Sequence, residues 1–136
     1  MDLEIRFPGG TRVDAAFDSF VVHTDQPASG GGEASAPTPF ELFLASIGTC
    51  AGIYVLGFLR QRNLPTHGLR VIQHVHSNRD TGMVEDMAIE ILVPEGFPEK
   101  YLPAMIRSAE LCAVKKHLEH PPNISVTARV GTPTNA

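Results

Sequence analysis

The chain has 136 residues, a length that suits one domain with its own hydrophobic core. Its 43 % hydrophobic and 19 % charged residues are typical of a globular protein, and its net charge of −4 gives no electrostatic basis for binding nucleic acid. We therefore predict a single domain over residues 1–136 with no nucleic-acid partner. The chain has two cysteines and no signal peptide at its start, so we expect a reducing compartment, the cytoplasm.

The first part of the chain has the patterns of three short strands. Residues 2–7 alternate between apolar and polar side chains, and residues 11–17 and 20–24 continue as two more strands after a Pro-Gly-Gly turn. Residues 25–37 are rich in Gly, Ser, Ala and Pro and form a loop by composition. Loops of this length in compact domains often line functional sites.

A long apolar helix is predicted over residues 38–63. Thr38 can cap its start, and Glu41 lies three residues later, as a capping box requires. Asn63 is an acceptable residue to end it, with a proline following shortly after. Residues 42–59 contain no charged side chain, so we expect the helix to be buried on most sides.

The uncharged run is close to the minimum length of a membrane span. It contains Ser46, Thr49 and three glycines, however, and the segments that follow alternate like strands that need a covered face. We therefore predict a core helix and no membrane partner. One small sheet can cover only one side of such a helix, so we predict a homodimer with this helix near the interface.

The rest of the chain has separate blocks of strand patterns and helix patterns. Residues 68–77 and 83–93 are predicted to pair as a hairpin, and residues 98–111 to form a second helix. Residues 112–119 either continue that helix or form a short separate one, and residues 124–130 alternate as a last strand. The predicted order is βββ-α-ββ-α(α)-β, and the predicted class is α+β.

The two cysteines are the residues with the clearest chemical potential. Cys50 lies in the middle of the long helix, and Cys112 lies beside the last helical segment. A redox pair, two inert core thiols and a metal site all fit this spacing. Local sequence alone nominates Cys112 as the reactive thiol, because a helix start with Lys115 and Lys116 nearby lowers a thiol pKa, whereas apolar surroundings would raise that of Cys50.

Other polar residues offer weaker candidates. Glu41 is either a catalytic carboxylate or only the helix cap. It lies nine residues before Cys50, about 180° around a straight helix and about 13 Å along it, so only a partner chain or a helix break could join the two. His74 and His76 lie two apart on a predicted strand, and His117 and His120 lie about one helical turn apart. Neither pair has a third metal ligand placed by the sequence, so no metal or cofactor is expected. The residues predicted to share the helix face of Cys50 and wall its pocket are Phe43, Ser46, Ile47, Ile53, Tyr54 and Gly57.

Two segments together resemble a known family. PFELFLASIGTC (39–50) places a cysteine on a long central helix, and CAVKKHLEHPP (112–122) places a second one at a helix start. These segments and the predicted element order resemble the OsmC/Ohr family of osmotically inducible and organic hydroperoxide resistance proteins. The resemblance covers essentially the whole chain and is closest to the OsmC-like branch.

The resemblance implies an intertwined homodimer and an oxidative stress response through a thiol-dependent peroxidase. Cys50 would attack an organic hydroperoxide, Cys112 would resolve the product as a disulfide, and an external dithiol would reduce it. An arginine of the N-terminal strands and a glutamate near the helix start would hold the thiolate. Arg12 is the choice for the arginine, ahead of Arg6, and Glu41 is the available glutamate.

The glutamate departs from the family pattern. Peroxidase members usually carry it ten residues before the cysteine, where this chain has Phe40. Glu41 follows one residue later, about 100° further around a helix. An alternative function therefore stays open, in which the same fold is a non-catalytic module that binds a small apolar or thiol-reactive ligand.

Overall fold

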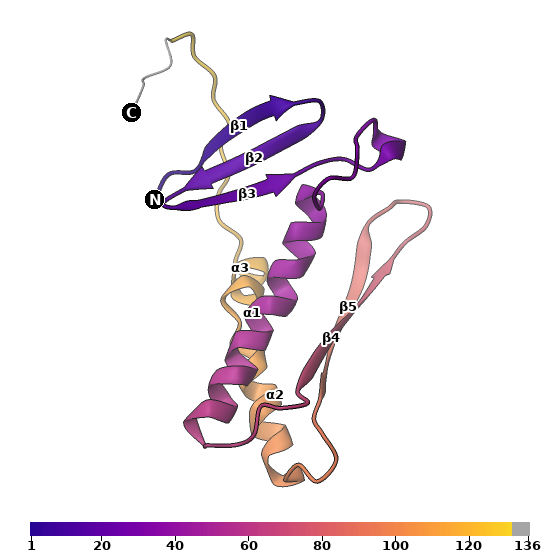
Figure 1. Ribbon diagram of the computed structural model, residues 1–136, viewed down its shortest axis with the longest axis vertical. Coiled ribbons are helices and arrows are strands. Elements are labelled where there is room, and N and C mark those ends of the chain that lie inside the picture. Colours follow the sequence, from indigo (N-terminus) through magenta and orange to yellow (C-terminus); the bar gives the residue numbers. More distant parts are fainter. Residues whose placement is uncertain (132–136) are drawn as a thin grey trace.

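The computed structural model describes residues 1–131 and has the predicted α+β fold. Its elements are β1 (Glu4–Gly9), β2 (Arg12–Phe17), β3 (Phe20–Thr24), α1 (Pro39–Gln61), β4 (Arg70–Ser77), β5 (Val84–Leu92), α2 (Leu102–Glu110) and α3 (Ala113–Glu119). Strands β1, β2 and β3 form an antiparallel meander, and β4 and β5 form an antiparallel hairpin. Figure 1 shows the meander beyond the start of α1, whereas the hairpin, α2 and α3 lie along the helix.

Helix α1 begins and ends as its sequence predicts. The Thr38 hydroxyl accepts a hydrogen bond from the Glu41 N–H, and the Glu41 carboxylate accepts one from the Thr38 N–H at 2.8 Å. At the other end, Asn63 adopts the left-handed conformation with φ of 52°. The N–H of Leu64 then reaches back to the carbonyl of Leu59, which satisfies one of the last free carbonyls of the helix.

The hydrophobic core lies around the second half of α1. This helix contributes Val55, Phe58 and Leu59 to the core. They pack against Phe97, which precedes α2, and against Met105, which lies in α2. The predicted helix over residues 98–111 begins as a 3₁₀ turn at Glu99–Tyr101 before α2, and α3 is a separate helix. This change of direction at Cys112 brings the start of α3 against α1.

In one chain, α1 is buried on one face only. The buried face includes Ile47, Ala51 and Val55, whereas the Ile53 side chain on another face is 59 % exposed. The expected burial on most sides is therefore not met within one chain, because the β4–β5 hairpin and α2 cover a single stripe of the helix. Among the described residues, α1 is the one helix long and apolar enough to cross a membrane. Core helices of soluble proteins have the same length and composition.

The predicted last strand does not form in this structure. Residues 121–131 have neither helical nor strand structure, and Ile124, Val126 and Val130 are almost fully exposed. Figure 1 shows this segment as an extended tail that leaves α3 and passes the meander. Alternation of apolar residues predicts which face a strand would bury, but a strand also needs a neighbouring edge to supply backbone hydrogen bonds.

Candidate functional site

The two cysteines meet where α3 begins against the middle of α1. Cys50 lies in the fourth turn of α1 and is partly buried, while Cys112 is the residue immediately before α3 and is only 2 % exposed. Both are free thiols, and they lie close enough for each to alter the pKa of the other. The structure thus brings together two residues that are 62 positions apart in the sequence.

The first turn of α3 points its free backbone N–H groups at Cys50. The N–H of Val114 makes the largest contribution to lowering the pKa of Cys50, and the Cys112 thiol and the N–H of Ala113 contribute in the same direction. These donors favour the negatively charged thiolate more than partial burial disfavours it, and they lower the pKa of Cys50. The N–H groups are free for this role because no carbonyl within α3 precedes them.

Cys112 has the opposite environment. Its burial raises the pKa of the thiol, and this effect outweighs the hydrogen bond that its sulfur accepts from the Lys115 N–H at 3.5 Å. The Cys112 thiol therefore stays protonated to a higher pH than the Cys50 thiol. The local argument from sequence, which nominated Cys112, is wrong in this structure because the start of α3 also serves the thiol on the neighbouring helix.

An apolar cavity of about 650 Å³ lies beside this pair. Its wall includes Cys112, together with Ile47 and Ala51 of α1 and apolar side chains of β5 and α2. The charged residues of the wall are Glu90, Glu110 and Lys115. Its apolar residues outside α1 are Met87, Ile89, Ile91, Leu102, Met105, Ile106, Ala109 and Leu118. Of the six residues predicted to wall a pocket, only Ile47 lines it.

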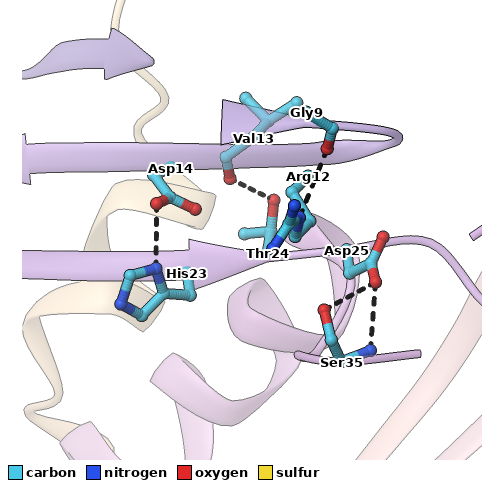
Figure 2. Close-up of polar contacts among 8 residues, drawn as sticks. All are labelled: Gly9, Arg12, Val13, Asp14, His23, Thr24, Asp25 and Ser35. Carbon is cyan, nitrogen blue, oxygen red and sulfur yellow. Dashed lines mark hydrogen bonds and ion pairs between the residues drawn. The ribbon is translucent and has the colours of Figure 1, made fainter. Parts of the chain in front are cut away.

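The other predicted site residues lie outside this contact. Arg12 is exposed at the β1–β2 turn, where its Nε donates to the Gly9 carbonyl at 3.3 Å, as Figure 2 shows. Arg6 forms an exposed ion pair with Glu4 at 2.6 Å. The Glu41 carboxylate is engaged in the α1 cap. Within residues 1–131, no hydrogen bond or ion pair joins any of these three residues to a cysteine.

The histidines do not gather into a metal site. His74 pairs with Glu90 at 3.1 Å, and the Nδ1 of His117 contacts the Ala113 carbonyl within α3. Over the described part of the chain, no three or more His, Cys, Asp or Glu side chains converge as metal ligands do. The donor set at the cysteines is two thiols and backbone amides, which suits thiol chemistry.

Two features of the structure were not predicted from the sequence. The backbone N–H groups of Ala113 and Val114 carry no side-chain signal, and only the direction of α3 reveals their role. The carboxylate of Asp25 is 1 % exposed and anchors the loop at residues 25–37. Its position directly after a strand and at the start of a Gly- and Ser-rich loop is the signal that could have identified it.

Two neighbouring free thiols, one with a lowered pKa and one with a raised pKa, make this the candidate site of the chain. The model of the OsmC-like protein family matches residues 30–127, and the chain therefore belongs to the OsmC-like family. The sequence matches no curated protein.

Solved structures share the fold at low sequence identity. A Psychrobacter arcticus protein assigned to osmotic stress and detoxification responses is 20 % identical, with a TM-score of 0.70 over 84 % of this chain and 85 % of that one. An OsmC-like protein from Mycoplasma pneumoniae is 13 % identical, with a TM-score of 0.68 over 88 % and 87 %. The organic hydroperoxide resistance protein OhrB of Bacillus subtilis is 14 % identical, with a TM-score of 0.51 over 89 % and 93 %.

Proposed function

We propose that this protein is a thiol-dependent peroxidase that reduces organic hydroperoxides in the cytoplasm as part of an oxidative stress response. The observation that carries the proposal is the environment of Cys50. Two backbone N–H groups of α3 and the thiol of Cys112 lower the pKa of its thiol. Family membership and the names of some structural neighbours support a stress- or peroxide-related role. OsmC-like proteins are generally soluble, which agrees with α1 as a core helix.

The proposed reaction uses the two thiols in sequence. The Cys50 thiolate attacks the terminal oxygen of the hydroperoxide, and an S–O bond forms as the O–O bond breaks, which leaves Cys50 as a sulfenic acid. The departing alkoxide takes a proton from water and leaves as an alcohol. Cys112 then attacks the resulting sulfenic acid, and a disulfide forms with loss of water. An external dithiol reduces this disulfide, regenerates both thiols and leaves as its own oxidised form.

A homodimer is part of the proposal. In one chain, Leu3, Ile5 and Phe7 of the first strand region are exposed on one face of the meander, and Ile53 is exposed on α1. Soluble proteins rarely leave large contiguous groups of apolar side chains exposed to water. A second copy would cover these faces and offer a strand edge to the tail at residues 121–131.

We propose supporting roles for Arg12 and Glu41 in that dimer. Arg12 would place a positive charge beside the Cys50 thiolate, and Glu41 would hold the arginine. The resemblance to the family's peroxidases supports these roles, together with the exposure of Arg12, which leaves its guanidinium free to turn toward a partner. Glu41 would have to leave the α1 cap, or share its two oxygens between the cap and the arginine.

A second candidate function is the binding of a small apolar or thiol-reactive ligand without catalysis. The cavity beside Cys112 favours it, because the cavity is mostly apolar and its wall includes Cys112, whose pKa is raised, and not Cys50. The engagement of Glu41 in the helix cap also favours it. In this case the two cysteines would serve only as packed core residues or as sensors of a thiol-reactive ligand, and the protein would not turn over hydroperoxides.

The deciding experiment is peroxide consumption with a dithiol reductant by the wild type, Cys50→Ser and Cys112→Ser. We expect cumene hydroperoxide to be consumed faster than hydrogen peroxide, and Cys50→Ser to lose at least about a thousandfold in rate, since it removes the nucleophile. If only Cys112→Ser is inactive, the roles of the two thiols are reversed. Absence of turnover by the wild type, with both thiols titratable, would favour the binding module.

A further inference from the structure

The carboxylate of Asp25 is the most completely hydrogen-bonded side chain of the N-terminal region. Asp25 follows β3 directly and is 1 % exposed. Its Oδ1 accepts from the Thr11 hydroxyl at 2.6 Å and from the Gln26 N–H at 2.8 Å, while its Oδ2 accepts from the Ser35 hydroxyl at 2.7 Å and the Ser35 N–H at 3.0 Å. Figure 2 shows the two bonds to Ser35.

These bonds tie together three segments. Thr11 belongs to the β1–β2 turn, and Gln26 and Ser35 belong to the loop that leads to α1. The backbone N–H of Asp25 donates to the carbonyl of Pro37, the residue before the α1 cap. The buried side chain of Asp25 therefore joins the β1–β2 turn to the loop, and its backbone N–H joins the same residue to the segment before α1.

The packing at Gly32 supports the same conclusion. A Cβ atom at this position would lie 2.0 Å from the Gln26 carbonyl oxygen and 2.7 Å from the Thr11 hydroxyl oxygen. The loop thus approaches the β1–β2 turn more closely than any residue with a side chain would allow. The contact between loop and turn is a specific one, built from a glycine, a hydroxyl and a carboxylate.

The bonds to Asp25 suit an ionised carboxylate. All the donors that surround it are N–H or O–H groups, and the Thr11 hydroxyl makes the largest contribution to lowering the pKa of Asp25 far below its ordinary value. An asparagine of the same shape would offer one accepting oxygen and would turn an NH₂ group toward the donors on the other side. Asp25→Asn therefore breaks the arrangement with very little change in volume.

We propose that Asp25 is a positioning residue that holds Arg12, through Thr11, in register with the start of α1. Thr11 is the residue directly before Arg12, and Figure 2 shows Arg12 and Asp25 at the same end of the meander. This inference rests on the proposed function, because it takes Arg12 as the charge beside the Cys50 thiolate. The hydrophobic core around Leu59 and Met105 is formed by other segments, so the role of Asp25 is separable from folding of the core.

The test is a double-mutant cycle between Asp25→Asn and Arg12→Ala. Two rates are measured for each protein: kcat/KM with cumene hydroperoxide, and alkylation of Cys50 by iodoacetamide from pH 5 to 9, read by peptide mass spectrometry. A displacement of about 1 Å can cost up to about a hundredfold in rate. We expect Asp25→Asn to lower kcat/KM about tenfold when Arg12 is present and less than about twofold in the Arg12→Ala background.

The matched control is Asp14→Asn, the same substitution at a buried carboxylate of the adjacent strand. Asp14 is bonded to His23 at 2.9 Å, and its bond lies within the meander. We expect this variant to change kcat/KM less than about twofold. If Asp25→Asn does not fold, Thr11→Val and Thr11→Ser provide the same test, because only the serine keeps the hydroxyl that donates to Asp25. We expect kcat/KM to fall in Thr11→Val and to stay near the wild-type value in Thr11→Ser.

The outcomes separate this inference from the proposed function. A wild type without peroxide turnover overturns the proposed function, while the alkylation rates still report whether Asp25 acts through Arg12. Equal losses from Asp25→Asn in both Arg12 backgrounds overturn the positioning role, because a purely structural residue would act independently of Arg12. If Arg12→Ala changes neither the alkylation rate of Cys50 nor the peroxide turnover, the positioning role of Asp25 is overturned as well.

Discussion

The middle of α1 and the start of α3 each carry one cysteine, and the two regions give these thiols opposite properties. Cys50 lies on a long apolar helix, yet its pKa is lowered by donors from α3. Cys112 stands at a helix start, yet burial raises its pKa. Each thiol takes its character from the segment that packs against it, since charge stabilisation depends on donors in space and desolvation depends on enclosure.

The largest expected difference between the two regions is in alkylation. Because the pKa of Cys50 is lowered and that of Cys112 is raised, Cys50 keeps its thiolate to lower pH and Cys112 ionises only at more alkaline pH. Each unit by which the two pKa values differ changes the ratio of the two thiolates about tenfold, so at pH 7 we expect Cys50 to react severalfold faster than Cys112 with iodoacetamide. Mass spectrometry of each cysteine peptide measures this. In urea the two rates should converge; preference for Cys112 in the native protein would reverse the assignment.

The next effect concerns the donor from α3. Val114→Pro removes the N–H that contributes most to the lowered pKa of Cys50, and proline is tolerated in the first turn of a helix. We expect the pKa of Cys50 to rise and its alkylation at pH 7 to slow about threefold to tenfold.

Val114→Ala is the comparison for this prediction, because it shortens the same side chain and keeps the N–H. The pH at which Cys50 alkylation is half-maximal should shift upward in Val114→Pro alone. Equal shifts in the two variants would mean that the side chain of Val114, and not its backbone, sets the pKa.

A smaller effect is expected at the cap of α3. The Cys112 sulfur accepts from the Lys115 N–H, and a serine oxygen is a stronger acceptor in the same position. We expect Cys112→Ala to be less stable than Cys112→Ser by about 0.5–1 kcal/mol in urea-induced unfolding, although both lack the second thiol. Equal stabilities of the two variants would show that the start of α3 needs no side-chain cap.

The smallest effect is expected at Glu41. Glutamine can replace glutamate in a capping box, so Glu41→Gln should change the free energy of unfolding by less than about 0.5 kcal/mol. Glu41→Ala, which removes the side-chain half of the capping box and keeps the Thr38 cap, is the reference for a loss of that bond. Turnover that falls tenfold or more in Glu41→Gln, at unchanged stability, would show that the carboxylate acts on Arg12 in addition to capping α1.

Local features of the fold were predictable and long-range ones were less so. The capping box at Thr38 and the left-handed Asn63 mark the ends of α1 because both depend on residues a few positions apart. The strand at residues 124–130 was predicted wrongly for this structure, because a strand needs an edge that the sequence does not position. The burial of α1 on most sides was not met within one chain for a similar reason, since cover comes from other segments.

The sequence by itself determined the order of the helices and strands up to α2, the ends of α1, the α+β class and the choice of the two cysteines as candidate reactive residues. Those features follow from side-chain periodicity and short-range hydrogen bonding. Only the tertiary structure decided which thiol is acidified, that Cys50 and Cys112 lie close together, and that Asp25 joins three segments. Backbone donors look the same in every sequence, so their effect on a thiol appears only when folding points them at it.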